Sequence, residues 1–452
     1  MAALPVIAVI DVGKTNKKLF LFDQDYHIVH ERSARFTETV DEDGDPCENL
    51  ESLRLSVFDS LRFAAAQKKY NVKAINFSAY GASFVYIDEE GTPLTPLYNY
   101  LKPYPAKLKE DFYNRYGGEE LFSVQTASPV LDSLNSGMQL YRLKHEQPAV
   151  FAQVKYALHL PQYLSYLVSG RACSDITSIG CHTNLWDFQK AGYHSWVKAE
   201  GFDQVLAPVI PYHETMPAVF PANGYQVGAG LHDSSAALIP YLMNFTEPFA
   251  LISSGTWCIS LNPFDHSVLT VPELQQDCLC YLDFKGKPVK ASRLFAGYMH
   301  DEQVKRIADH FNQNPVHYRN MVFQPELIRQ LRIKLPQTMP FEKRDLAEFS
   351  SDAEAYHQLI ADLVAQQCIS TQLVLKDTPV RRIFVDGGFS KNGIYMNLLA
   401  ASFPGIEIYA ASIAQATALG AALAIHHSWN SKTIPTDLIE LKYYSPSPEL
   451  HA

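Results

Sequence analysis

The first candidate site is a polar turn near the start of the chain, Asp11-Val-Gly-Lys-Thr-Asn16. A glycine turn exposes backbone N–H groups, and a lysine and a hydroxyl add further donors, so the turn can hold phosphate oxygens. The residues expected to do so are Gly13, Lys14, Thr15 and Asn16. The carboxylate of Asp11 would repel phosphate and is better suited to orienting Mg²⁺ or its waters. The alternative is an ordinary hairpin turn, and the spacing of a Walker A loop is absent.

Two later glycine turns have similar chemistry. Ser253-Ser-Gly-Thr-Trp257 ends a predicted strand and offers Gly255 and Thr256 to phosphate. In Val385-Asp-Gly-Gly-Phe-Ser-Lys-Asn392, the glycines give a flat surface on which an adenine or ribose can lie. The nucleotide contacts expected there are Gly387, Gly388 and Asn392. The GxGxxG pattern of a dinucleotide fold is missing, and a helix packed on a sheet without ligand is the alternative.

A fourth segment, Gly228-Ala-Gly-Leu-His-Asp233, brings a carboxylate to the start of a predicted apolar helix. A carboxylate at this place can accept a proton from a substrate hydroxyl as a general base. The structural alternative is that Asp233 or Ser234 caps the helix.

The dipeptide His-Asp occurs at residues 232–233 and again at His300-Asp301. An all-helical metal phosphohydrolase would use such pairs as metal ligands, but the strand-rich pattern of this chain argues against that fold. We therefore expect His300-Asp301 to be a solvated helix start.

The elements around these turns follow a repeated order. Strands are predicted at 5–11 and 17–23, with a polar glycine turn between them, and the same pattern recurs at 249–253 and 258–261. The remaining predictions are strands at 27–36, 72–79, 84–88 and 382–385, and helices at 50–70 and 413–426. The last helix is rich in alanine and contains Gly420, which indicates close packing. Residues 96–196 are expected to form a mostly helical insertion.

Composition limits the class of protein. The chain has 452 residues, 47% of them hydrophobic, with a net charge of −10, which argues against a dedicated nucleic-acid binder. Seven cysteines without a CxxC pair indicate a reducing compartment, and Cys278 and Cys280 are expected in a core rather than on a metal. No apolar run of about 18 residues is present, so we expect a cytoplasmic protein that does not bind membranes.

Taken together and in this order, the four segments resemble those of the FGGY carbohydrate kinases, whose fold is actin/hexokinase-like. The resemblance covers roughly residues 5–430. The turn at 11–16 is similar to the family's first phosphate loop, the turn at 253–257 to its second, and the segment at 386–392 to its adenosine segment. Asp233 falls where the family has its catalytic base. The closest similarity is to the L-rhamnulose and L-fuculose kinases.

The resemblance implies an α/β fold of two ribonuclease H-like lobes with a nucleotide cleft between them. We expect a sugar-binding lobe with the catalytic base at 1–245 and a nucleotide-binding lobe at 246–452. It further implies ATP and Mg²⁺ as cofactors, a ketose or 6-deoxyketose as substrate, and a monomer or homodimer. The expected sugar contacts are His232, Ser83, Asn99 and Asp175, although Asp175 is also a candidate helix cap and Ser83 a candidate turn residue.

Three departures from the family pattern lie on the sugar side: Lys14 in the first loop, no acidic residue in Gly81-Ala-Ser-Phe84, and no arginine in Tyr98-Asn-Tyr-Leu-Lys-Pro-Tyr104. They leave two alternatives open. One is a non-catalytic protein that senses a sugar or nucleotide, and the other is a phosphate-releasing ATPase or phosphatase on the same fold.

Overall fold

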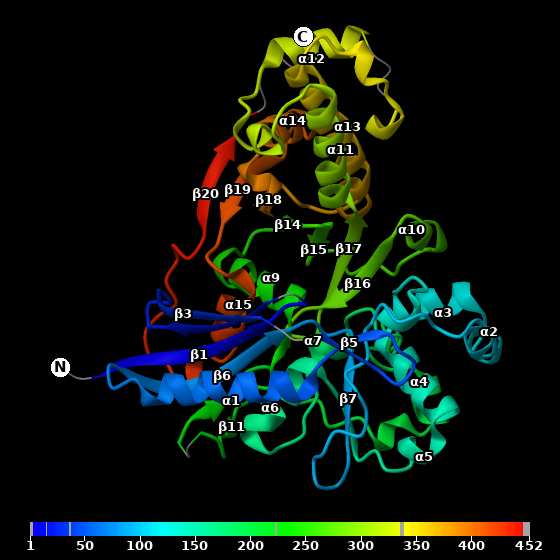
Figure 1. Ribbon diagram of the computed structural model, residues 1–452, viewed down its shortest axis with the longest axis vertical. Coiled ribbons are helices and arrows are strands. Elements are labelled where there is room, and N and C mark those ends of the chain that lie inside the picture. Colours follow the sequence, from blue (N-terminus) through cyan, green and yellow to red (C-terminus); the bar gives the residue numbers. More distant parts are fainter. Residues whose placement is uncertain (1–2, 15, 36–37, 222–223, 335–338, 446–452) are drawn as a thin grey trace.

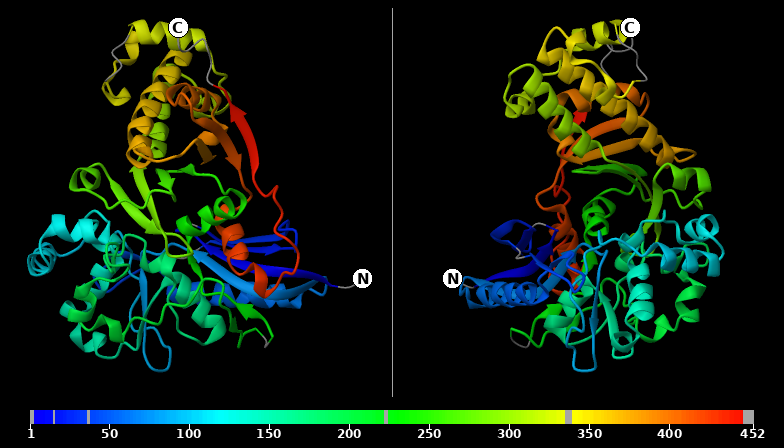
Figure 2. Two further views of the ribbon diagram at one scale, coloured as in Figure 1. Left: turned by 180° about the vertical axis from the view of Figure 1, so that it is seen from behind. Right: turned by 45° about the vertical axis from the view of Figure 1, so that its right-hand side comes forward.

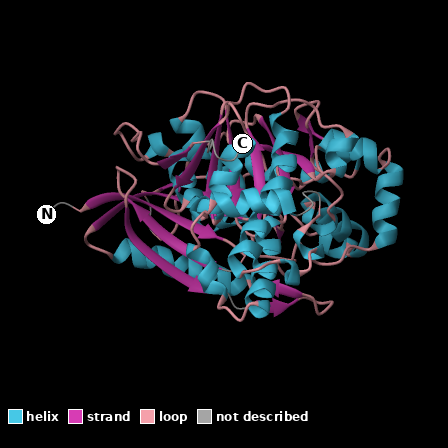
Figure 3. Cartoon of the chain, turned by 90° about the horizontal axis from the view of Figure 1, so that it is seen from above, coloured by secondary structure: helices cyan, strands magenta, loops and turns pink. Residues whose placement is uncertain are grey.

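The computed structural model describes residues 3–445, except residues 15, 36–37, 222–223 and 335–338 (Figure 1). Its two large sheets lie one above the other in the view of Figure 1, and each belongs to one half of the sequence. Figure 3 shows the same chain along the long axis of Figure 1, with the strands lying among helices.

The first sheet is built around strand β1. This strand pairs antiparallel with β2 and parallel with β6, because its run of β-branched residues is suited to a strand buried on both faces. The strands are β1 (Leu4–Val12), β2 (Asn16–Phe22), β3 (Ile28–Arg35), β6 (Tyr70–Ala79), β11 (Met216–Pro217), β12 (Gln226–Val227) and β13 (Leu231–His232). Their order is β11-β12-β6-β1-β2-β3, and β13 also pairs with β6.

The second sheet repeats this arrangement around β14, which pairs antiparallel with β15 and parallel with β18. Its strands are β14 (Phe249–Ser254), β15 (Cys258–Asn262), β16 (Cys278–Leu282), β17 (Pro288–Leu294), β18 (Arg382–Gly387), β19 (Glu407–Ser412) and β20 (Glu440–Tyr444). Their order is β16-β17-β15-β14-β18-β19-β20. The repeat predicted from the strand–turn–strand pattern is therefore confirmed as two sheets with the same central pairing.

Helices cover the outer faces. On the first sheet, α1 (Leu50–Ala66) and α6 (Leu160–Ser169) share a core with β1 and β6. Asn49 begins α1 because its side chain accepts a hydrogen bond from the backbone N–H of Ser52. On the second sheet, the covering helices are α11 (Ala296–His310), α13 (Asp352–Leu375) and α14 (Gly393–Ser402).

Two helices lie between the sheets and contact each other, α9 (Asp233–Asn244) and α15 (Ala416–Ala424) (Figures 1 and 2). Although α15 comes from the end of the chain, it packs on β1 and β6 of the first sheet. Helix α9 in turn contributes Leu238 and Tyr241 to the core of the second sheet. The helix predicted at 413–426 is observed at Ala416–Ala424 and, together with α9, connects the two halves.

The insertion has a core of its own, in which Trp196 is fully buried and packs edge-on against Phe112. It is mostly helical, as predicted, with three short strands, β8, β9 and β10. The remaining strands are β4 (Glu38–Val40), β5 (Pro46–Glu48), β7 (Phe84–Ile87), β8 (Tyr156–His159), β9 (Trp186–Asp187) and β10 (Gly192–Tyr193). The remaining helices are α2 (Ala106–Arg115), α3 (Glu119–Thr126), α4 (Ser136–Glu146), α5 (Pro148–Phe151), α7 (Ile176–Ile179), α8 (Ser195–Ala199), α10 (Val271–Gln275) and α12 (Pro325–Lys334).

Two further expectations can be compared with the fold. The helix predicted at 50–70 ends at Ala66, because Tyr70 already begins β6. All seven cysteines are free thiols, and Cys278 and Cys280 share one hydrophobic core, as predicted. Within the described ranges, no helix has both the length and the apolar character needed to cross a membrane.

Candidate active site

The first polar turn lies between β1 and β2. The backbone N–H of Gly13 donates to the carbonyl of Asn16, which closes the turn, with a distance of 3.0 Å between nitrogen and oxygen. Thr15 lies outside the described residues. This bond fits an ordinary hairpin turn as well as a phosphate loop, and the roles of Gly13, Lys14, Thr15 and Asn16 toward a nucleotide stay predictions.

Asp11 lies near the end of β1, between the buried residues Ile10 and Val12. Its Oδ2 accepts a hydrogen bond of 2.9 Å from the hydroxyl of Thr417, which belongs to α15. Burial, together with the negative charge of the nearby Asp233, raises the pKa of Asp11 to about 6. The carboxylates of Asp11 and Asp233, whose charges act on each other, are oxygen donors of the kind that a hard divalent cation such as Mg²⁺ prefers.

Asp233 is the first residue of α9, where β13 passes into the helix. Its Oδ1 accepts a 2.6 Å hydrogen bond from the backbone N–H of Ser234, and 31% of its side chain remains exposed. Burial raises the pKa of its carboxyl above the usual range. A partly exposed carboxylate with a raised pKa is suited to accept a proton from a bound hydroxyl.

His232 packs beside this carboxylate, with its Nε2 3.3 Å from Oδ1 of Asp233. Burial lowers the pKa of His232 to about 3, so that the imidazole is neutral at physiological pH. The ring explains the glycine at position 81, since a Cβ there would lie only 2.8 Å from Cδ2 of His232. Among the four expected sugar contacts, His232 is the one that adjoins Asp233.

The other three have structural partners. Asp175 is fully buried and caps α7 by accepting hydrogen bonds from the backbone N–H and the hydroxyl of Thr177. The Thr177 oxygen accepts in turn from the backbone N–H of His232, at 3.0 Å. Asp175 is therefore a helix cap, the alternative to a sugar contact, and it helps to position His232. Burial raises the pKa of the Asp175 carboxyl to about 6.

Ser83 is also buried, and its hydroxyl donates to the carbonyl of Tyr98 at 2.8 Å. Asn99 binds the loop around it, since its Nδ2 donates to the carbonyl of Pro46 and its Oδ1 accepts from the backbone N–H of Leu101. These bonds occupy both side chains within the protein, and their contact with a sugar stays a prediction.

An aromatic wall near Asp233 was not anticipated. It consists of Tyr80 and Tyr100, whose pKa values are raised by burial and by the charge of Asp233. The ammonium of Lys14 lies 5.1 Å from the ring centre of Tyr100 and 3.6 Å from Oε1 of Glu48. Lys14 of the first loop thus already has an anionic and an aromatic neighbour. Neither neighbour could be identified from the sequence around Lys14.

The second and third glycine turns line one cavity of about 510 Å³. Of the expected nucleotide contacts, Gly255, Thr256, Gly388 and Asn392 line it. Gly387 lies behind the lining, where its φ of +80° and its closeness to Ser254 leave no room for a side chain. Asn392 caps α14 through its Oδ1, and its Nδ2 donates to the hydroxyl of Tyr356 at 2.9 Å.

Several lining residues were missed in the sequence. They are Gly297, His300, Asp301, Arg319, Asn320, Tyr356, Phe389 and Lys391. Gly297 could have been recognised in the sequence, because a glycine at a helix start permits another segment of backbone to approach closely. A Cβ at this position would lie 1.9 Å from the carbonyl oxygen of Gly255. The expectation of a solvated helix start at His300-Asp301 is confirmed for Asp301, whose side chain is 77% exposed, and wrong for His300. His300 belongs to α11, its Nε2 is 3.2 Å from the hydroxyl of Tyr356, and burial lowers its pKa.

Side chains of the second sheet connect the second loop with the region of Asp233. The guanidinium of Arg293 lies 5.3 Å from the ring centre of Trp257, and the ring of Tyr281 lies 5.9 Å from that of His232. The charge of Arg293 also acts on Tyr281, which lies opposite Val289 on the neighbouring strand. Arg293 therefore contacts the second loop and acts electrostatically on a residue beside His232.

Two family models match the chain. Residues 6–238 match the N-terminal domain of the FGGY family of carbohydrate kinases, and residues 246–433 match a carbohydrate kinase FGGY C-terminal domain. Among curated relatives, a rhamnulokinase of Mannheimia succiniciproducens is 22% identical, covering 92% of this chain and 88% of the relative. A rhamnulokinase of Oceanobacillus iheyensis is 21% identical, with 91% and 90% covered.

Solved structures agree on the fold. A carbohydrate kinase from Novosphingobium aromaticivorans superposes with a TM-score of 0.80 at 24% identity, covering 98% of this chain and 95% of the other. A xylulose kinase from Rhodospirillum rubrum gives a TM-score of 0.82 at 14% identity, covering 98% and 94%. At these identities the likeness extends to the mixed α/β fold of two sheets with crossing helices.

Proposed function

Because this chain belongs to the FGGY family of carbohydrate kinases, we propose that it phosphorylates a ketose or 6-deoxyketose, with Asp233 as general base. The family assignment makes the chain a sugar kinase that uses ATP. L-Rhamnulose and L-fuculose are the first candidate substrates, because relatives that match over about nine-tenths of the chain are rhamnulokinases. Similar solved structures include xylulose kinases, so other ketoses are candidates as well.

The observation that carries the proposal is the carboxylate of Asp233. It is partly exposed, has a raised pKa and stands beside a neutral imidazole, in the lobe opposite the glycine-lined cavity. Phosphoryl transfer depends mainly on positioning and charge neutralisation. In the proposed reaction, Asp233 accepts the proton of the sugar hydroxyl as this oxygen approaches the γ-phosphorus in line.

The nucleotide is assigned to the cavity of about 510 Å³. The Gly-Gly surface at Gly388 receives the adenosine, and the donors of Gly255 and Thr256 receive phosphate oxygens. The first loop, with Gly13 and Asn16, receives them from the other lobe. The carboxylate of Asp11 fits Mg²⁺, which when bound neutralises charge that develops on the phosphate oxygens.

Two features support a sugar with an apolar face. The rings of Tyr80 and Tyr100 pack edge-on with their centres 5.6 Å apart, and in the proposal an aromatic face packs against C–H groups of the sugar, including the methyl group of a 6-deoxy sugar. His232 offers a polar edge beside the same carboxylate. Closure of the two lobes would exclude water, which otherwise competes as the phosphoryl acceptor.

The test is coupled ADP release with Mg·ATP over a panel of ketoses, 6-deoxyketoses and polyols, led by L-fuculose, L-rhamnulose, L-ribulose and xylulose. One sugar that raises ADP release at least about 100-fold over the sugar-free rate supports the proposal. Equal ADP release with and without sugar would favour an ATPase. Ligand-induced stabilisation without ADP release would favour a sensor and contradict the proposal.

A further inference from the structure

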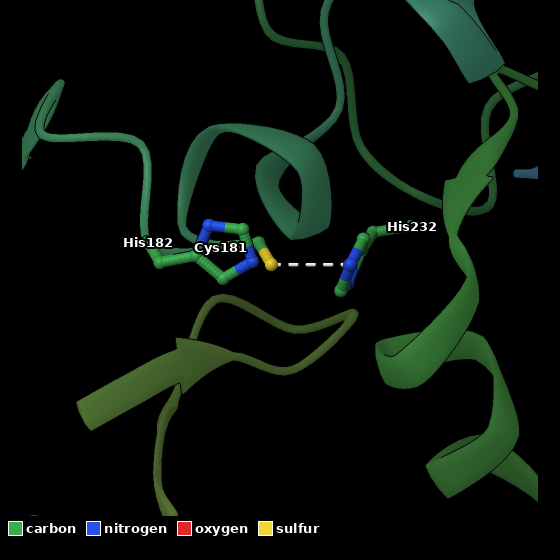
Figure 4. A group of neighbouring side chains, drawn as sticks. All are labelled: Cys181, His182 and His232. Atoms are coloured by element: carbon green, nitrogen blue, oxygen red, sulfur yellow. Dashed lines mark hydrogen bonds between the residues drawn. The ribbon is translucent and has the colours of Figure 1, made fainter. Parts of the chain in front are cut away.

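A second group of side chains adjoins the proposed base. Cys181 and His182 follow α7, and His232 ends β13, so two segments about 50 residues apart contribute. Each of the three side chains belongs to a residue at most 8% exposed. One ligand atom from each lies within 4.8 Å of the others, and the sulfur of Cys181 lies between the two imidazole rings in Figure 4.

The hydrogen bonds of this group leave nitrogen and sulfur atoms that can bind a metal close to one another. Nδ1 of His182 lies 3.2 Å from the carbonyl oxygen of Leu134 and can donate to it, which leaves Nε2 unprotonated. A metal-bound histidine is usually held in this way by a carbonyl on its other nitrogen. Nε2 of His232 lies 3.1 Å from the sulfur of Cys181 and 3.3 Å from Oδ1 of Asp233.

This geometry is unlike that of a Cys–His–Asp proton relay. In a relay the thiol and the carboxylate contact opposite ring nitrogens. Here both contact the same nitrogen of His232, and its Nδ1 has no hydrogen-bond partner in the described part of the chain. The sulfur of Cys181 and one nitrogen from each histidine instead lie within 4.8 Å of one another, and Oδ1 of Asp233 lies 3.3 Å from the nitrogen of His232. Ligand atoms of a tetrahedral zinc site, with bonds of about 2.0–2.3 Å, lie about 3.5 Å apart, which is close to the distances found here.

We propose that Cys181, His182 and His232 bind a thiophilic divalent cation of the zinc class, with Asp233 as the fourth ligand, and that this cation inhibits the kinase. A thiolate with two imidazoles selects zinc-like ions over Mg²⁺, which prefers oxygen ligands. The sulfur–metal bond replaces the S–H bond, and the thiol proton is released to solvent. Inhibition follows because a coordinated carboxylate no longer accepts the sugar proton; this part rests on the proposed function, whereas metal binding does not.

A cluster of carboxylates elsewhere among the described residues serves as a contrast. Asp41, Asp43 and Asp45 also lie close together, but the ammonium of Lys102 stands among them, 2.6 Å from Asp41 and 2.7 Å from Asp43. The ammonium therefore already occupies the space between these carboxylates, and a cation held there by oxygen alone would give no thiolate signal.

The test is titration of the full, metal-free protein with Co²⁺ as a spectroscopic probe. One Co²⁺ per chain should produce a thiolate-to-cobalt charge-transfer band and the intense visible bands of tetrahedral cobalt, and Zn²⁺ should displace both. Cys181→Ala and His182→Ala should weaken binding at least about 100-fold, since even the loss of an outer partner costs about 10–100-fold. Cys368→Ser, which changes a cysteine on α13, should bind as the unchanged chain does.

Inhibition is measured separately, with Mg·ATP in excess over Zn²⁺. Stoichiometric Zn²⁺ should lower turnover more than about 10-fold in the unchanged chain and leave Cys181→Ala unaffected. Absence of the charge-transfer band in the unchanged chain, or its persistence in Cys181→Ala, would overturn the metal site. If Cys181→Ala does not fold by circular dichroism, His182→Ala decides in its place. A chain that binds Co²⁺ through sulfur yet phosphorylates no sugar keeps the site and refutes the proposed function.

Discussion

The hydroxyl of Thr417 donates to Oδ2 of Asp11 at 2.9 Å, although 406 residues separate them. A matching contact joins α9 of the first half to the second sheet, where the hydroxyl of Tyr241 donates to Oδ2 of Asp386 at the end of β18, at 3.2 Å. Each crossing helix thus reaches a carboxylate at the end of a central strand in the other half. The two halves are joined through the same groups that adjoin the phosphate turns.

The contact between α9 and α15 depends on Gly420. A Cβ at this position would lie 1.8 Å from the carbonyl oxygen of Ala236, and a backbone oxygen cannot move aside cheaply. We expect Gly420→Ala to lower the free energy of unfolding by about 1–3 kcal/mol, as overpacked cores do. Chemical denaturation measures this. Gly393→Ala, in the first turn of α14 with no atom within 4 Å of the new Cβ, is the matched control and should be neutral or stabilising. Equal destabilisation by both would contradict the prediction.

Gly297 has a corresponding role for the second phosphate loop. Its Cβ would lie 1.9 Å from the carbonyl oxygen of Gly255, which lines the cavity. Gly297→Ala should therefore displace the loop and reduce kcat/KM for ATP by about 100-fold, the effect of a misplacement of about 1 Å. Steady-state kinetics at saturating sugar gives the value. The control is Gly192→Ala on β10, where the Cβ meets only one atom, at 4.0 Å. Unchanged kinetics in Gly297→Ala would show that the loop tolerates the added methyl group.

The role of Asp233 is tested by Asp233→Asn, which keeps the shape of the side chain and removes the proton acceptor. Turnover should fall at least about 100-fold, because general-base catalysis contributes about 10²–10⁴-fold. Equilibrium ATP binding should not change. Asp309→Asn, an exposed aspartate on α11, controls for the loss of a charge and should have full activity. Near-normal turnover in Asp233→Asn would remove the base assignment.

His159 makes the stability depend on pH. It stacks on Phe84 at 4.0 Å and lies 2.9 Å from the hydroxyl of Ser136, and burial lowers its pKa from 6.5 to about 3. Between these values the unfolded chain binds a proton that the native chain does not. The free energy of unfolding should therefore fall as pH is lowered below about 6.5, by about 1.4 kcal/mol per pH unit for this residue.

His159→Gln removes this dependence. Urea denaturation at a series of pH values should give a shallower slope for the variant than for the unchanged chain, whatever the absolute stabilities. His427→Gln, which changes an exposed histidine, should give the unchanged slope. The same slope in His159→Gln and in the unchanged chain would show that His159 is not the group responsible.

The elements themselves were largely predictable from the sequence. The strands at 5–11 and 249–253, the glycine turns after them and the repeat of this pattern follow from alternating and continuous apolar runs, which depend on neighbours along the chain. The order of the four polar segments was sufficient to identify the family, because each is short and contiguous. Gly420 indicated a close approach by its place in an alanine-rich helix, although its partner could not be identified.

What the side chains contact was decided only by the tertiary structure. Asp175 and Ser83 have polar types suited to a sugar site, yet both are buried and bonded to the protein. Lys14 lies beside Glu48 and Tyr100, and Cys181 meets His232. Local spacing is set by a few consecutive residues, whereas Cys181 and His232 are 51 residues apart and Lys14 and Tyr100 lie further apart still. They meet only where sheets, turns and crossing helices have already packed, and that packing minimises the free energy of the whole chain rather than of any one segment.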